Sequence, residues 1–63
     1  MSKLNLENNL ASVILRINEL RYAGISKERI RPFIHKGLKI ADALSGGMNY
    51  DRIKRLAENY LRE

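Results

Sequence analysis

The spacing of apolar residues in the first third of the chain constrains the fold more than any other feature. Between Leu6 and Leu20, large aliphatic residues recur at intervals of four, three, four and three positions. On an α-helix this spacing forms one narrow stripe, which is typical of a helix that packs along another helix. The stripe consists of Leu6, Leu10, Val13, Ile17 and Leu20. Because Ala11, Leu15 and Tyr22 form a second apolar line on roughly the opposite side, we expect this helix to have neighbours on two sides.

Glycines divide the chain into three helical segments. The helices are expected over about residues 5–23, 27–44 and 50–61. Gly24 should end the first helix in the left-handed conformation that glycine adopts at little cost, and the pair that begins at Gly46 should end the second. The apolar–polar alternation typical of strands is absent. The sequence therefore predicts one all-α domain over residues 1–63, with a frayed tail at 1–3.

The second and third helices are expected to begin with one shared pattern: an apolar residue, Ser or Asn, any residue, an acid, Arg and Ile. It occurs at Ile25–Ile30 and again at Met48–Ile53. Ser26 and Asn49 are each expected to cap the free amides of the first turn. A duplicated helical unit and two independent helix starts explain the repeat equally well.

Two residues inside the segment 27–44 are unusual for a helix. Pro32 lacks an amide hydrogen and crowds the carbonyl of Glu28, so it either kinks the first turn or begins a separate helix after a single turn at 27–31. Gly37 costs about 1 kcal/mol relative to alanine at a helix interior position. That cost is easier to explain if another helix crosses closely at Gly37.

The small size of the chain favours self-association. A chain of 63 residues buries only about 60% of its unfolded surface, so its core is marginal. Proteins of this size usually rely on disulfides, a metal or oligomerisation. With no cysteine and one histidine, disulfides are excluded and too few ligands remain for a zinc site. We therefore expect no metal and no cofactor, and a homodimeric helical bundle joined along the Leu6–Leu20 stripe.

Composition also bears on location and chemistry. The absence of cysteine fits a reducing compartment, and no apolar run approaches the roughly 20 residues of a membrane span, so a cytoplasmic protein without a membrane partner is expected. Recognisable nucleophile motifs and phosphate-binding loops are absent, and no lysine follows Ser45–Gly47 at the position such a loop needs. We expect no enzymatic activity.

The positive charge of the chain is concentrated in its middle. Twelve Lys and Arg against seven Asp and Glu give a net charge of +5. Residues 24–47 hold five basic and two acidic residues, Glu28 and Asp42. In the last helix, opposite charges four residues apart should form ion pairs along the helix. The expected pairs are Asp51–Arg55, Lys54–Glu58 and Glu58–Arg62.

The middle segment carries the candidate functional surface. Arg31, His35 and Lys39 are four residues apart, so they form a row along one helix face. Such a row could follow the phosphates of DNA or RNA, although an ordinary solvated face explains the pattern as well. With flanking residues included, the candidate nucleic-acid-binding residues are Lys27, Arg29, Arg31, His35, Lys36 and Lys39.

The segment from Leu20 to Ile34 resembles the turn region of bacterial helix-turn-helix DNA-binding proteins. The resemblance rests on a glycine, an aliphatic residue and a small capping residue, followed by two spaced apolar residues: Gly24, Ile25, Ser26, Ile30 and Phe33. It implies that Lys27, Glu28, Arg29 and Arg31 lie near the DNA groove. The segment departs from the pattern at Leu20, where a small residue is preferred, and at Pro32, inside the implied recognition helix.

Two functions remain open from the sequence. The first is a small, non-enzymatic, homodimeric regulator of the phage or plasmid type, which binds nucleic acid through the basic row and acts on transcription. The alternative is an adaptor or inhibitor whose helical surface binds a partner protein with an acidic surface.

Overall fold

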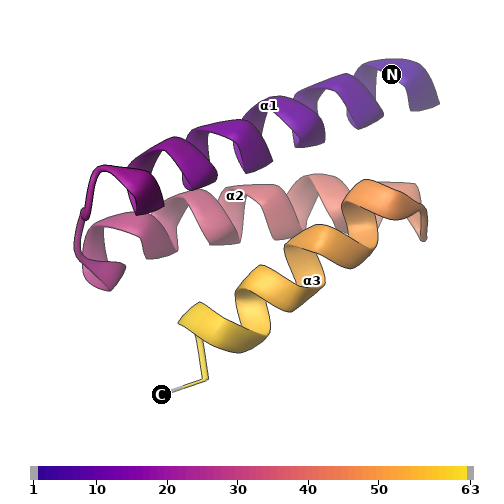
Figure 1. The fold of residues 1–63 in the computed structure, drawn as a ribbon. Helices are drawn as coiled ribbons and strands as arrows, with labels where there is room; N and C mark the ends of the chain where they lie inside the picture. Colours follow the sequence, from indigo (N-terminus) through magenta and orange to yellow (C-terminus); the bar gives the residue numbers. More distant parts are fainter. Residues whose placement is uncertain (1, 63) are drawn as a thin grey trace.

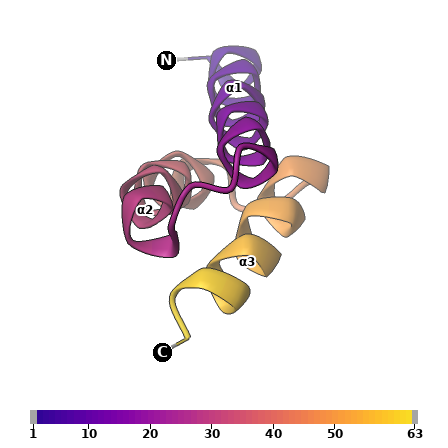
Figure 2. The same ribbon diagram turned by 60° about the vertical axis from the view of Figure 1, so that its left-hand side comes forward.

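Three helices joined by two short turns make up residues 2–62, the part of the chain described by the structure, which is a computed structural model (Figure 1). The helices are α1 (Lys3–Tyr22), α2 (Lys27–Leu44) and α3 (Met48–Tyr60). α1 and α2 lie side by side in opposite directions, and α3 packs against both, so the three helices surround one core (Figure 2). This arrangement confirms the predicted all-α, three-helix domain.

α1 begins earlier than the sequence predicted. The Ser2 hydroxyl accepts a hydrogen bond from the Asn5 N–H at 3.2 Å, and the helix begins at Lys3. Ser2 therefore satisfies one of the free amides that every helix start exposes. Of the expected tail at 1–3, Met1 lies outside the described residues, whereas Ser2 and Lys3 form the helix start.

The end of α1 follows the prediction at Gly24, which has φ +74°. The Gly24 N–H donates to the Arg21 carbonyl at 3.0 Å, and the Ile25 N–H donates to the Leu20 carbonyl at 3.1 Å. These two bonds define a Schellman motif, which pairs the last carbonyls of a helix with the residues just beyond it. The motif reverses the chain so that α2 returns along α1.

The two helix starts that share a sequence pattern differ in structure. Ser26 occupies the N-cap position of α2, although its hydroxyl makes no capping hydrogen bond. α3 begins at Met48 with Gly47 at its N-cap, so the prediction of Asn49 as the cap was wrong. Gly47 has φ +114°, a conformation that favours glycine, and this turn allows the helix to begin before Asn49.

α2 continues through Pro32 without a break. In its first turn, the Ser26 carbonyl accepts hydrogen bonds from the N–H groups of Arg29 at 3.1 Å and Ile30 at 3.2 Å. The first of these has the spacing of a 3₁₀ turn and the second that of an α-helix. The alternative in which Pro32 divides the segment into two helices is therefore excluded.

The apolar stripe of α1 packs inside the chain. Leu10 and Ile17 have no exposed surface, Val13 is buried, and Leu6 and Leu20 pack at the edge of the core. Their partners come from α2 and α3 and are Ile30, Ile34, Ala41, Leu44, Ile53 and Leu56. The side chains expected to join two copies of the protein thus meet the chain's own helices.

Gly37 is the point where all three helices meet. A Cβ atom at this position would lie 2.6 Å from Cδ1 of Ile53 in α3 and 3.4 Å from Cγ1 of Val13 in α1. The first distance is shorter than any van der Waals contact, so only glycine fits without movement. The expectation that a helix crosses closely at Gly37 is confirmed.

We expect Gly37→Ala to destabilise the protein by about 1 kcal/mol, measured by urea denaturation. The gain of about 1 kcal/mol in helix propensity is outweighed by about 1–3 kcal/mol of overpacking against Ile53. Ile53→Val removes the closest methyl group, so in the Gly37→Ala background it should cost less than in the wild type. A Gly37→Ala protein more stable than the wild type would show that Ile53 moves aside freely.

Candidate nucleic-acid interface

The structure separates the six predicted basic residues into three pairs on different sides of α2. Lys27 and Arg31 face the C-terminal end of α3, as their contacts with Tyr60 show. Lys36 lies beside α1, and Arg29 is two helical turns before it on the same side of α2. His35 and Lys39 form the third pair, one helical turn apart, and both are exposed. On the continuous helix α2, Arg31, His35 and Lys39 keep the four-residue spacing of the predicted row, and Arg29 and Lys36 lie further round the helix.

The pair nearest α3 contributes to the fold. The Arg31 Nε–H donates a hydrogen bond of 2.9 Å to the Tyr60 carbonyl, and Lys27 Nζ lies 5.8 Å from the centre of the Tyr60 ring. From α1, the Arg21 guanidinium lies 5.9 Å from the same ring. A helix C-terminus carries partial negative charge on its free carbonyls, so a guanidinium there is favourable. Arg31 thus links the start of α2 to the end of α3 through a hydrogen bond.

The other two pairs leave three cationic side chains and one histidine exposed on α2. Arg29, His35, Lys36 and Lys39 are exposed, and none of them forms an ion pair within residues 2–62. Lys36 lines a hollow of about 360 Å³ together with Asn9, Ser12 and Val13 of α1 and Ile40 of α2. The two acids of α2, Glu28 and Asp42, are exposed and form no ion pair in the same range. The α2 basic surface, defined as Arg29, His35, Lys36 and Lys39, is therefore open to an anionic partner.

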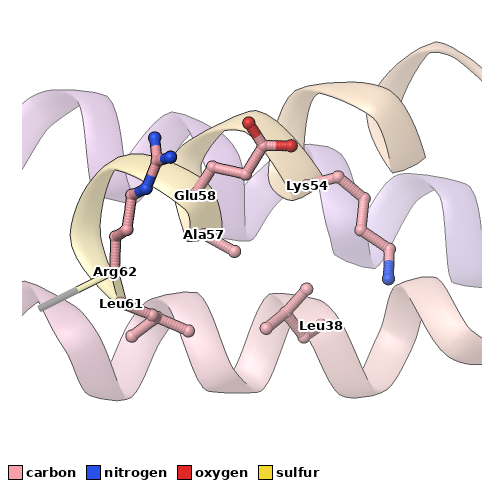
Figure 3. A pocket seen from close by; sticks show the side chains of 6 residues that line it. All are labelled: Leu38, Lys54, Ala57, Glu58, Leu61 and Arg62. Carbon is pink, nitrogen blue, oxygen red and sulfur yellow. The ribbon is translucent and has the colours of Figure 1, made fainter.

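The ion pairs expected along α3 are not formed. Figure 3 shows the Glu58 carboxylate and the Lys54 ammonium directed to different sides of the helix. Lys54 Nζ lies instead 5.1 Å from the centre of the Tyr50 ring. Exposed pairs of this kind contribute little, because side-chain entropy offsets a weak attraction in water. As a result, Arg55 has no ion-pair partner within residues 2–62.

The hollow in Figure 3 lies between α2 and α3 and measures about 490 Å³. Its lining mixes apolar and charged side chains of both signs: Leu38, Lys54, Ala57, Glu58, Leu61 and Arg62. Lys54 and Arg62 outnumber the single Glu58 carboxylate here, but that carboxylate lies among them and weakens their attraction for a phosphate.

A second basic region, between α1 and α3, was not predicted. A hollow of about 490 Å³ is lined by Asn18, Arg21, Tyr22 and Tyr60. An adjoining one of about 250 Å³ is lined by Ile14, Asn18, Arg21, Arg52, Arg55, Leu56 and Asn59. We call the two together the α1–α3 groove. The sequence does carry a signal for it, because Arg52, Arg55 and Asn59 have the i, i+3, i+7 spacing of one helix face.

The helix-turn-helix resemblance is not supported by the arrangement of the helices. In that motif the two helices cross at roughly 90–120°. Here α1 and α2 run antiparallel along each other (Figure 1). The turn from Gly24 to Ser26 instead connects the two antiparallel helices of a helical hairpin.

Comparisons with known proteins give no functional information. No protein-family model matches this chain, and neither the curated proteins nor the solved structures searched contain a significant match. Among residues 2–62, no helix is both long and apolar enough to cross a membrane, and no group of three metal-ligating side chains comes together.

We expect Arg31→Ala to lower the free energy of unfolding by about 1 kcal/mol, because a charged donor to the end of α3 is lost. The measurement is urea denaturation, together with hydrogen exchange of the amides near Tyr60, which should become faster. Arg29→Ala is the matched control, since Arg29 is exposed and should change stability by less than about 0.5 kcal/mol. Equal effects of the two variants would contradict the role of Arg31.

Proposed function

We propose that this protein is a small, non-enzymatic regulator that binds nucleic acid through the α2 basic surface. The observation that carries the proposal is that α2 exposes Arg29, Lys36 and Lys39 on one helix, and none of these cations has an ion-pair partner within residues 2–62. An unpaired cation keeps its full attraction for a phosphate, whereas a paired one must first give up its partner. The net charge of +5 adds a general attraction for polyanions.

The chemistry of this surface favours phosphate contacts over base reading. Lysine side chains are flexible point charges, and such contacts position a protein on DNA without reading its sequence. Lys36 and Lys39 are three residues apart and therefore neighbours on the helix. Binding through them should release counterions and depend steeply on salt.

We expect the double substitution of Lys36 and Lys39 by alanine to weaken binding to a random duplex about tenfold at low salt. The slope of log K against log salt should become shallower by about 2, because each phosphate contact contributes about 0.9. Fluorescence anisotropy at two salt concentrations measures both quantities.

A matched control removes two positive charges elsewhere. Lys3 and Lys54 lie on α1 and α3, and replacing both by alanine gives the same net charge as the first variant. The proposal requires the control to bind more tightly than the α2 variant. Equal losses in both variants, or no binding by the wild type at low salt, would contradict it.

Self-association is the second part of the proposal. The α1 stripe is used inside the chain, but Leu4 and Leu15, which are 69% and 62% exposed, lie on one outward line of the same helix. A second copy that covered these leucines, and left Tyr22 two turns beyond Leu15 uncovered, would enlarge the marginal core of a 63-residue chain.

We expect Leu15→Glu to reduce the molar mass measured by light scattering from twice the 7.3 kDa of one chain toward that of a single chain. A carboxylate in an apolar interface is costly because it loses its hydration. Ser12→Glu adds the same charge at an exposed position on another side of α1 and should leave the mass unchanged. A wild-type protein that stays at 7.3 kDa at high concentration would refute the dimer.

A further inference from the structure

The α1–α3 groove has a different chemistry from the α2 basic surface. It gathers Arg21 from α1 with Arg52 and Arg55 from α3, and its described lining contains no carboxylate. Arg52 and Arg55 form no ion pair or side-chain hydrogen bond within residues 2–62. Three guanidinium groups from two helices therefore face one concave surface with nothing of opposite charge to neutralise them there.

The groove also holds arginine and amide groups in defined positions. The Arg21 guanidinium donates to Asn18 Oδ1 at 3.3 Å and lies 5.9 Å from the centre of the Tyr60 ring. Asn59 of α3 contributes a second amide to the lining. Arginine pairs with phosphate through a planar fork of donors, and amides bond to sugar and base edges.

An exposed aromatic ring lies at the rim of the groove. Tyr22 is 95% exposed, although it is in the last turn of α1 beside Arg21. A tyrosine ring in water gains nothing for the fold, yet its face can stack on a nucleic-acid base. Stacking of this kind needs an unpaired base, because the faces of duplex bases are already covered by their neighbours.

The groove is poorly suited to bind an acidic helix of a partner protein. A docked amphipathic helix needs apolar pockets for side chains spaced along one face. The apolar residues of the groove floor, Ile14 and Leu56, are only 5% and 8% exposed, so they offer almost no surface to such anchors. The lining that remains accessible is arginine, asparagine and tyrosine.

We propose that the α1–α3 groove binds single-stranded nucleic acid, with phosphates at Arg52 and Arg55 and a base stacked on Tyr22. A positive groove combined with an aromatic platform is the combination by which single strands are bound without sequence preference. The inference rests on the proposed class of partner, nucleic acid. It assigns single strands to the α1–α3 groove, whereas the α2 basic surface is proposed to bind a duplex.

The test compares a labelled 12-nucleotide oligothymidylate with a 12-base-pair duplex by anisotropy at low salt. Tyr22→Ala should weaken single-strand binding about tenfold and change duplex binding less than about twofold, because only the single strand offers a free base face. Tyr22→Phe keeps the ring and should retain single-strand binding. Since Tyr22 is exposed, circular dichroism should confirm that both variants remain folded.

The arginines and the α2 lysines provide the matched comparison. Replacing Arg52 and Arg55 by alanine should reduce single-strand binding more than the equal loss of charge at Lys36 and Lys39, and the reverse should hold for the duplex. Single-strand binding that is unchanged in Tyr22→Ala and in the arginine variant would overturn the inference while leaving the duplex proposal intact. Single-strand binding that requires Tyr22, without any duplex binding, would support the inference and refute the α2 basic surface.

Competition by an acidic peptide tests whether the groove instead binds a helix of a partner protein. A helical peptide of alternating leucine and glutamate blocks, with the net charge of the oligonucleotide, should not compete with the single strand for the groove. Competition by the peptide at equal or lower concentration than the oligonucleotide would overturn the inference and assign the groove to an acidic protein helix.

Discussion

The close approach of three helices at Gly37 is the constraint on which the rest of the structure depends. Because position 37 has no side chain, Ile53 of α3 and Val13 of α1 reach the α2 backbone at the same level of the core. The helix propensity lost at this glycine, about 1 kcal/mol, is small beside the burial of Ile53, which has no exposed surface. This contact sets where α3 lies, and therefore which of its faces lies beside α1 and which meets α2.

The cationic side chains of this protein divide between structural and exposed roles. Arg31 and Lys27 surround Tyr60 at the end of α3, where the free carbonyls favour positive charge. A guanidinium bound in this way is less available to a phosphate than one in water. The cations at Lys36, Lys39, Arg52 and Arg55 have no ion pair within residues 2–62, and they carry the two binding proposals. A count of basic residues along the sequence therefore overstates the positive charge that is accessible to a partner.

Much of the fold could be predicted because its signals are local. The Leu6–Leu20 spacing, the left-handed Gly24 and the extent of α2 each depend on neighbouring residues in the chain, and the structure agrees with them. The prediction of Asn49 as a cap was wrong because Gly47, two residues earlier, adopts a positive φ that few other residues tolerate, and the helix begins directly after it at Met48. The ion pairs of α3 were not found because exposed charges gain too little from pairing to hold their side chains in place.

By itself, the sequence determined that this chain forms three amphipathic helices with short turns, since helix periodicity and capping act over only a few residues. Only the tertiary structure decided what each face does. Packing against α2 and α3 took up the α1 stripe that the sequence assigned to a second copy, and it turned Arg31 toward Tyr60. It also brought Arg21 beside Arg52 and Arg55, which are more than thirty positions away in the chain. Contacts between distant segments depend on how helices pack, and no local pattern encodes that packing.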